Sequence, residues 1–374
     1  MHVTSKGHII QLDGIRFIAV ALVLIAHLTN TRLPLGELGV TMFFVLSGFL
    51  ITRILMLSRD KYKAEPGGFK RYIRKFLIRR TIRIFPVYYL CILVLYLIGV
   101  PSVREHLFWL VLYATNIYMA VNAAWMGSVD HLWSLAVEEQ VYLIFPFLIF
   151  FVPRKNLLTV LGLMGLFSVL LRFYFFMTGK SWIVSYVSMP ACLDSFAFGG
   201  FMAWLQLNKK EAFTNLFRQK WLVVASLLVW FLVYYFSVKL GEKYTPANPY
   251  NVIKIVFDRL SASAFSFFLI GSAAVGFTGG MALLLENKAV VYLGRISYGI
   301  YLYHNFVFNH YHSYTIPNHP VVRLFNKVYR HFPELENYQS FQVLVVTALT
   351  VLVASVSWHF FEKPINALKD KYAY

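Results

Sequence analysis

The sequence is poor in cysteine, in acidic residues and in charge of any kind. Only Cys91 and Cys192 occur, both within apolar segments, which excludes a disulfide framework and a CxxC metal site. Charged residues make up 14% of the 374 residues, hydrophobic residues 59%, and the mean hydropathy is +0.60, so an ordinary soluble domain is excluded. The net charge of +18 comes from basic residues that cluster between apolar segments. That pattern is typical of membrane orientation and does not indicate nucleic-acid binding.

Apolar segments of about 17–25 residues recur along the chain, and each is long enough to cross a hydrocarbon core of about 30 Å. We therefore predict an all-α fold, a polytopic transmembrane helix bundle of about ten spans that forms one integral membrane domain over residues 1–374. The first span is expected to be retained because no small-residue cleavage site follows it. The predicted spans are 12–30, 39–57, 84–100, 132–152, 157–177, 182–206, 221–239, 253–277, 293–312 and 338–360.

One further stretch, His106 to Asn122, is apolar but short, and the positive-inside rule decides its assignment. If it does not cross, most loop lysines and arginines fall on one side of the membrane. If it crosses, every later loop changes sides and the bias nearly disappears. We therefore predict that both termini are cytoplasmic and that 106–122 is interfacial or re-entrant on the outer face.

Arg16 and His27 are ionisable residues inside the first predicted span. Eleven residues at about 100° each bring the two side chains to within about 20° of one helical face, about 16 Å apart along the axis. An ionisable group inside a bilayer costs about 2.5–3.5 kcal/mol or more, so its presence favours a functional role. The span thus presents a cation near the membrane surface and an imidazole beyond mid-depth, and we place the chemistry at this pair.

The segment from Ser58 to Arg83 is basic and amphipathic, and most of its side chains fit snorkelling to anionic headgroups. Arg80 and Arg83 differ because they lie about one helical turn apart at the mouth of a span, just before Pro86. A guanidinium group binds phosphate through two parallel hydrogen bonds, which lysine cannot do. The pair is therefore a candidate site for a phosphorylated donor from the cytoplasm.

Two further motifs have both a structural and a functional interpretation. Ser47-Gly48, in FFVLSGFLIT, allows a helix or a ligand to approach closely, and helix packing is favoured over a nucleophilic serine. Glu138 and Glu139, in HLWSLAVEEQVYL, cannot both lie on one helix face, so one is expected to face the protein interior. That carboxylate either pairs with a buried arginine or has a catalytic role.

The remaining charges at membrane depth are assigned mainly to structure, because an unpaired charge there is too costly to keep. Asp194 is expected to pair with Arg172, and Asp258 and Arg259 are also given structural roles. His304, in LGRISYGIYLYH, is expected to be a hydrogen-bonded structural histidine more than a catalytic one.

Several of these segments occur in order along nearly the whole chain, and together they resemble the acyltransferase-3 family of integral membrane acyltransferases. The series comprises LDGIR with His27 (Arg16-x10-His27), FFVLSGFLIT, RRTIRIFP with Arg80-x2-Arg83, HLWSLAVEEQVYLIFP, MPACLDSFAFGG, LGRISYGIYLYH and FEKP. The resemblance implies about ten helices with cytoplasmic termini, in the inner (plasma) membrane. It also implies transfer of an acyl group, commonly acetyl, from cytoplasmic acyl-coenzyme A as co-substrate, with no metal.

The family's typical acceptors are hydroxyls of surface carbohydrates, such as lipopolysaccharide O-antigen, exopolysaccharide or capsule. Some members carry an added extracytoplasmic SGNH-type hydrolase domain. This sequence ends fourteen residues after Phe360, so chemistry by such a domain is expected to be absent or to come from a partner. A small molecule, a membrane lipid or a cyclic glucan stays open as the acceptor, and the oligomeric state is not predicted.

The resulting mechanistic hypothesis places the donor phosphates on Arg16, Arg80 and Arg83, with the thioester reaching toward His27. His27 then acts as general base on the acceptor hydroxyl or forms a transient acyl-histidine. Glu138 or Glu139 orients the imidazole and is counted with it as catalytic. The main alternative is a transporter or flippase of an acylated or carbohydrate substrate, since buried charges also line transport pathways.

Overall fold

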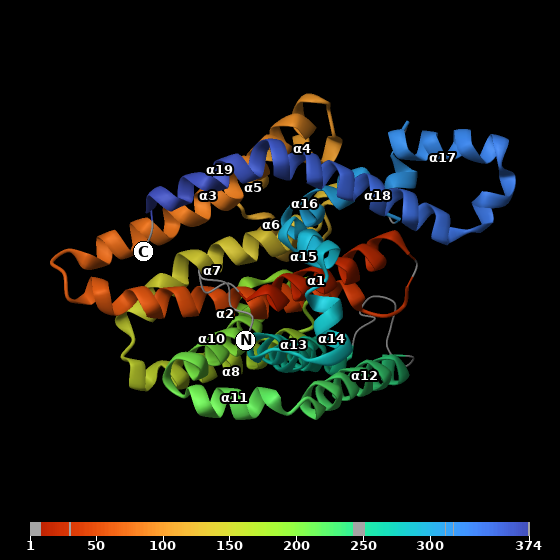
Figure 1. Ribbon diagram of the computed structural model, residues 1–374. Coiled ribbons are helices and arrows are strands. Elements are labelled where there is room, and N and C mark those ends of the chain that lie inside the picture. The colour runs from red at the N-terminus through yellow and green to blue at the C-terminus, as the bar shows by residue number, and fades with distance from the viewer. Residues whose placement is uncertain (1–8, 30, 242–250, 311, 317, 373–374) are drawn as a thin grey trace.

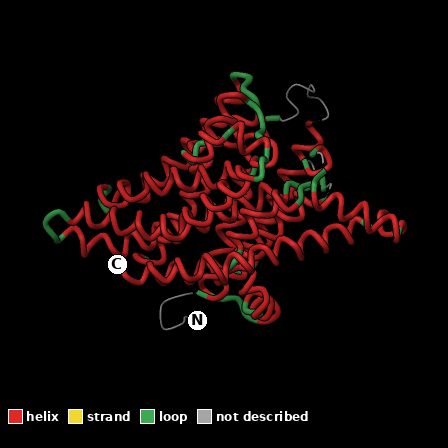
Figure 2. Tube along the Cα trace, turned by 90° about the horizontal axis from the view of Figure 1, so that it is seen from above, coloured by secondary structure: helices red, strands yellow, loops and turns green. Residues whose placement is uncertain are grey.

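The computed structural model describes residues 9–29, 31–241, 251–310, 312–316 and 318–372, and over these residues it is helical with no strand. The predicted all-α helical bundle is thereby confirmed (Figure 1 and Figure 2). The helices are α1 (Ile10–Leu28), α2 (Leu35–Lys63), α3 (Gly68–Leu97), α4 (Pro101–Glu105), α5 (Leu107–Val111), α6 (Thr115–Asn122), α7 (Leu132–Phe151), α8 (Leu157–Met177), α9 (Trp182–Val187), α10 (Leu193–Asn208), α11 (Lys210–Arg218), α12 (Trp221–Gly241), α13 (Asp258–Val275), α14 (Gly279–Leu285), α15 (Lys288–Arg295), α16 (Ser297–Val307), α17 (Pro320–His331), α18 (Gln339–Ser357) and α19 (Lys363–Ala367). Short 3-10 and π segments complete them, namely η1 (Gly127–Val129), η2 (Arg154–Asn156), η3 (Met189–Cys192), η4 (Ile253–Phe257), η5 (Ser313–Thr315), η6 (Pro333–Asn337), η7 (Trp358–Glu362) and η8 (Leu368–Tyr372).

Seven helical segments within the described chain are long and apolar enough to cross a membrane. They are α1, α2, α3, α7, α8 with η2, α12, and α18 continued to Ala367. An eighth candidate is a pair of segments, Ile253–Val275 and Gly279–Leu285, bent by 91° at the break between them. The chain is therefore a multi-pass membrane protein, while the count of ten spans and the cytoplasmic termini stay predictions.

The predicted span 182–206 is built from two helices with a break between them. Ser188 adopts an extended conformation between α9 and η3, and α10 follows. Pro190 has no N–H group, so it could not donate to the Tyr186 carbonyl as a continuing helix requires. That carbonyl instead accepts a hydrogen bond from Arg259 Nη2, at 2.7 Å. The break thus leaves a carbonyl free to hold a buried guanidinium group.

Two other predicted segments are also divided. The stretch 106–122 forms α5 and α6, of five and eight residues, and neither is long enough to cross a membrane. The predicted span 293–312 covers the end of α15 and all of α16, which are separated at Ile296. These short helices lie beside longer ones, and α16 packs on both α18 and α1.

The basic segment before the third predicted span begins in the last turns of α2, and its part from Gly68 onward joins the span in a single helix, α3, of 30 residues. At 1.5 Å per residue this helix is about 45 Å long, so its basic half extends well beyond a hydrocarbon core of about 30 Å. The C-terminal turns pack on that half, where Arg79 Nη1 donates to the Lys369 carbonyl at 2.9 Å. Figure 1 shows α3 and the blue C-terminal helix α19 side by side.

The centre of the bundle is the contact of α2 with α1, α7 and α10. Gly48 on α2 and Gly199 on α10 allow the two backbones to touch, because a β-carbon at Gly48 would overlap the carbonyl oxygen of Phe196 and one at Gly199 that of Val45. The helix-packing interpretation of Ser47-Gly48 is therefore correct for the glycine.

Candidate active site

Two cavities lie one beyond the other within the bundle, and we name them by their side chains. The arginine cavity is bounded by α1, α2, α3, α7 and α16 and has a volume of about 100 Å³. It is lined by Arg16, Arg80, Arg83, Glu138 and Glu139, together with Ser47 and aromatic residues. The three arginines and two glutamates predicted from separate motifs thus converge on one small space.

The histidine cavity is larger, with a volume of about 820 Å³. His27, His131 and His312 line it, and the aromatic side chains of Trp125 and Trp182 form part of its wall. His312 Nε2 lies 2.9 Å from Asp130 Oδ2, which also faces this cavity. A polar, aromatic-walled space of this size can hold a bulky polar ligand.

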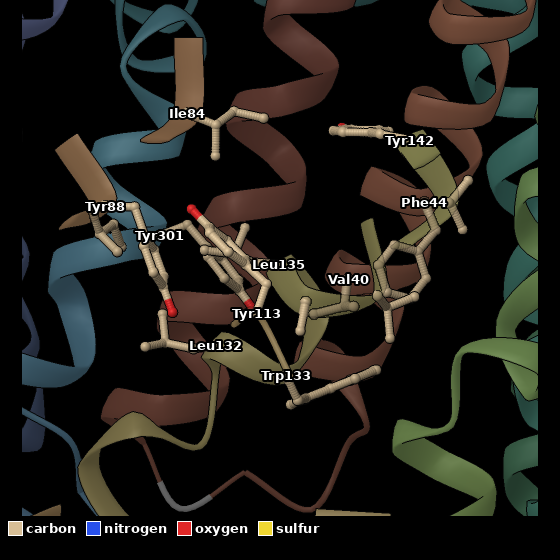
Figure 3. Close-up of a cluster of buried hydrophobic side chains, with 14 of the residues drawn as sticks. Val40, Phe44, Ile84, Tyr88, Tyr113, Leu132, Trp133, Leu135, Tyr142 and Tyr301 are labelled. Atoms are coloured by element: carbon tan, nitrogen blue, oxygen red, sulfur yellow. The ribbon is translucent and has the colours of Figure 1, made fainter. Parts of the chain in front are cut away.

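Among the described residues, Val40 and Tyr301 line both cavities, so they form the wall between them. Figure 3 shows Val40, Leu135 and Tyr301 between the arginine-cavity side, marked by Ile84 and Tyr142, and the histidine-cavity side, marked by Trp133. The Tyr301 hydroxyl lies 2.5 Å from Ser134 Oγ and donates to the His131 carbonyl at 2.8 Å. The wall is therefore made of side chains that line both cavities.

Helix α1 carries a predicted site residue into each cavity. Arg16 lines the arginine cavity and His27 the histidine cavity, with the buried Val20 and Val23 on the same face between them. The Arg16 guanidinium forms an ion pair with Asp13 at 2.5 Å. Both residues therefore face the protein interior, and the predicted stripe connects the two cavities.

His27 has a histidine as its partner, which differs from the expected carboxylate. His27 Nδ1 lies 2.6 Å from His304 Nε2, and the two rings are nearly coplanar, at 5°. Glu138 and Glu139 line the other cavity, because they follow Ser134 on α7 by about one helical turn, beyond the wall. The expectation that either glutamate orients His27 is therefore wrong, because the position of α7 along the bundle places both carboxylates at the arginine cavity.

Glu138 instead organises the arginine-cavity wall. Its Oε1 accepts a hydrogen bond from Ser47 Oγ at 2.8 Å, and its Oε2 accepts one from the Tyr142 hydroxyl at 3.1 Å. Glu139 Oε1 is buried and has no hydrogen-bond partner within the described part of the chain. Ser47 therefore belongs to the cavity through Glu138, while its neighbour Gly48 serves packing.

Arg80 and Arg83 face the arginine cavity without forming an ion pair. The Arg80 guanidinium lies over the rings of Tyr142 and Phe76, with its central carbon 5.1 Å and 5.6 Å from the ring centres. No carboxylate oxygen of the described residues lies within 4 Å of either guanidinium group. Two adjacent cations that form no contact ion pair are a candidate site for an anionic ligand.

Several other buried charges form ion pairs, as expected for structural groups, whereas the buried Arg259 donates to the Tyr186 carbonyl and forms no ion pair with a described residue. Arg172 Nη2 lies 2.6 Å from Asp194 Oδ2, so the predicted pair is confirmed. Asp258 binds Lys254 at 2.5 Å, and Lys254 also binds Glu37 at 2.8 Å. These ion pairs lie at or near the wall of the histidine cavity.

Comparison with known proteins agrees with the geometry. A family model described as an acyltransferase domain matches residues 9–360. The chain belongs to the acyltransferase-3 family. The family expected from the motifs is thereby confirmed.

The matched relatives are themselves acyltransferases by name. O-acetyltransferase OatA of Staphylococcus aureus strain NCTC 8325 / PS 47 is 26% identical over 97% of this chain and 58% of its own length. A putative O-acetyltransferase of Staphylococcus aureus strain COL is 26% identical over 95% of this chain and 57% of its own length. This acyltransferase-3 chain therefore spans less than two thirds of the length of these relatives. No solved structure matches it.

Sequence reasoning missed several residues of the histidine cavity. Glu37, Asp130, Lys254 and His312 lie at helix ends or in loops and were not singled out. Asp130 directly precedes His131 at the start of a span, which is a weak signal in this acyltransferase-3 sequence. The others had no signal, because residues far apart in the chain meet only through tertiary packing.

Proposed function

We propose that this chain is an O-acyltransferase that moves an acyl group, commonly acetyl, from cytoplasmic acyl-coenzyme A to a hydroxyl of a surface carbohydrate. The membership of the acyltransferase-3 family and the relatives named O-acetyltransferase support the reaction class. The donor, the acceptor and the location in the inner membrane belong to the proposal.

The observation that carries the proposal is the pair of cavities connected by α1. The arginine cavity has the guanidinium groups of Arg80 and Arg83, which form no ion pair with a described residue and suit the phosphates of coenzyme A. The histidine cavity has an imidazole and aromatic walls, which suit a hydroxyl-bearing acceptor. Arg16 and His27 lie about 16 Å apart along the helix, a distance similar to the length of the pantetheine arm.

In the proposed reaction, Arg16, Arg80 and Arg83 hold the donor phosphates at the mouth of the arginine cavity. This cavity is small, so we expect only the pantetheine arm of the donor to enter it. The arm then passes between the side chains of Val40 and Tyr301 toward the histidine cavity. The positive-inside rule places the arginines on the cytoplasmic side and the histidine cavity on the outer side. Donor and acceptor then approach from opposite faces of the membrane and meet near His27.

His27 is the proposed general base. It takes the proton of the acceptor hydroxyl while the hydroxyl oxygen attacks the thioester carbonyl carbon. The carbon–sulfur bond then breaks, and the coenzyme A thiolate leaves with the bonding electron pair. Glu138 and Glu139 are retained as site residues on the donor side, where Glu138 holds Ser47 and Tyr142 along the path of the arm.

The decisive experiment uses the purified protein in lipid nanodiscs with acetyl-coenzyme A, and measures the release of free thiol. Surface glycans from cells with and without the gene are compared by mass spectrometry in parallel. We expect His27-dependent thiol release and a glycan that carries the mass of added acetyl groups. Absence of both would contradict the proposal and favour a transporter or flippase.

A further inference from the structure

His304 is a buried histidine that the proposed mechanism leaves unused, and its contacts determine the protonation of its neighbour. It lies on α16, three residues after Tyr301, and its side chain is fully buried. His304 Nδ1 lies 2.6 Å from the Tyr301 carbonyl oxygen, and His304 Nε2 lies 2.6 Å from His27 Nδ1. The carbonyl, His304 and His27 therefore form a linear series of hydrogen bonds.

The carbonyl end of this series sets the position of every proton in it. A carbonyl oxygen only accepts hydrogen bonds, so His304 Nδ1 must carry the hydrogen. A neutral imidazole has a single N–H, which leaves His304 Nε2 as an acceptor. His27 Nδ1 must then be the donor, since two ring nitrogens this close need one proton between them. His27 Nε2 is left with its lone pair free.

The third histidine nearby does not interrupt the series. The His131 ring packs edge-on against the His304 ring, with their centres 4.9 Å apart. His131 Nε2 lies 3.1 Å from the Leu302 carbonyl oxygen, so it too is tied to the backbone of α16. His131 thus packs beside His304, and its hydrogen bond to Leu302 leaves the bond between His304 and His27 intact.

We propose that His304 is a positioning residue that holds His27 in the tautomer with a free Nε2, so that this nitrogen serves as the base. The inference rests on the proposed function. In a Ser-His-Asp triad, a buried carboxylate orients the catalytic histidine. Here a neutral histidine, itself bound to a backbone carbonyl, takes that role. A neutral partner avoids placing another charge inside the bilayer, where the cost is high.

A spectroscopic measurement on the unmodified protein tests the tautomer directly. The protein with ring-¹⁵N-labelled histidine is examined by solid-state NMR in lipid bilayers, and the His27 signals among the eleven histidines are identified as those lost in His27→Gln. We expect a protonated Nδ1 and an unprotonated Nε2 on His27. A protonated Nε2 with a bare Nδ1 would overturn the inference.

A pair of variants tests the consequence for catalysis, with free-thiol release from acetyl-coenzyme A as the readout. His304→Leu removes the acceptor for His27 Nδ1 and should lower kcat by about 10- to 100-fold, the range seen for partners that orient metal-bound histidines. The KM for acetyl-coenzyme A should not change, because the arginine cavity is untouched. His304→Gln, whose amide oxygen can accept the same hydrogen bond, should recover most of the lost rate.

The outcomes separate this inference from the proposed function. If His27→Ala is inactive and His304→Leu retains the full rate, the inference is wrong while the function stands. If both variants retain the full rate, the assignment of His27 as base is wrong. If His304→Gln is as impaired as His304→Leu while both unfold at the temperature of the unmodified protein, the accepting role is wrong.

Discussion

The arginine cavity and the histidine cavity treat their buried cations differently. At the histidine cavity, Arg172 is paired with Asp194, and Lys254 is held between two carboxylates. At the arginine cavity, Arg80 lies against aromatic rings, and neither Arg80 nor Arg83 has a carboxylate of the described chain within 4 Å. Arg259 at the histidine cavity also forms no ion pair with a described residue, but it donates a hydrogen bond to the Tyr186 carbonyl at 2.7 Å. The buried cations of the histidine cavity are thus satisfied by the fold, whereas the Arg80 and Arg83 guanidinium groups suit an anionic ligand.

The two cavities also differ in how precisely their polar groups are placed. At the histidine cavity, backbone carbonyls bind His131, which lines it, and His304, which is buried behind His27. In the arginine cavity, hydrogen bonds hold Glu138 and Tyr298, whereas the Arg80 guanidinium lies over aromatic rings. This difference matches a chemical step on one side and the capture of a flexible charged donor on the other. Four substitutions test that division.

The largest expected effect is that of His27→Ala, which removes the proposed base. Thiol release from acetyl-coenzyme A should fall by about 10²- to 10⁴-fold, the usual contribution of general base catalysis, with an unchanged donor KM. The protein should still insert into the membrane. His331→Ala is the matched control, because His331 is exposed on α17 and lines neither cavity. Full activity in His27→Ala would remove the distinction between the two cavities.

A loss of stability is expected from Asp194→Ala, which leaves the buried Arg172 unpaired. Breaking a buried ion pair from one side costs about 3–5 kcal/mol, so the unfolding transition in detergent should move to a clearly lower temperature. Asp60→Ala is the control, because the Asp60–Arg154 pair is exposed and is worth about 0–1 kcal/mol. Equal effects of the two substitutions would contradict a structural role for Arg172.

A smaller effect, confined to donor binding, is expected from Arg80→Lys. Hydrogen bonds to charged groups are worth about 1.5–3 kcal/mol, so losing one of two parallel bonds should raise the KM for acetyl-coenzyme A about tenfold and leave kcat unchanged. Arg74→Lys is the control, since Arg74 is exposed on the same helix.

A second donor sharpens this prediction. Acetyl-pantetheine lacks the nucleotide phosphates, so Arg80→Lys and the unmodified protein should use it equally well. A normal KM for acetyl-coenzyme A in Arg80→Lys would argue against two-point phosphate binding.

The smallest effect is expected from Tyr301→Phe at the wall between the cavities. The ring remains, and the hydroxyl's bonds to Ser134 and the His131 carbonyl are lost, which should reduce stability by about 1 kcal/mol and change kcat little. Tyr303→Phe is the control, because the Tyr303 hydroxyl bonds Ser357 and lines neither cavity. A rate loss as large as that of His27→Ala would instead make the Tyr301 hydroxyl part of the chemistry.

Much of the fold could be predicted from local patterns. Long apolar segments correspond to helices, and Gly48 packs against another helix as expected. The breaks were not predicted. Pro190 was visible in the sequence, but its effect on the span 182–206 depends on Arg259, which supplies the missing donor from another helix.

The residues of the candidate site were predicted from the sequence, but their separation into two cavities was not. The spacing of Arg16 and His27 on one helix established their common face, since helix geometry is local. The partner of His27 was beyond this reasoning, because His304 lies 277 residues away in the chain. Glu138 was assigned to the wrong neighbour for the same reason, since periodicity does not define the depth of one helix relative to another.

Local sequence patterns were enough to establish that this protein lies in a membrane, which residues share a helical face, and at which positions guanidinium groups are available to bind phosphate. These follow from composition and from the 3.6-residue repeat, which act over short distances. The packing of the helices was needed to see that the arginines line one cavity and His27 the other, and that His304 is the hydrogen-bond partner of His27. The axial offset and rotation of packed helices set those contacts, and they depend on side-chain packing across the whole bundle.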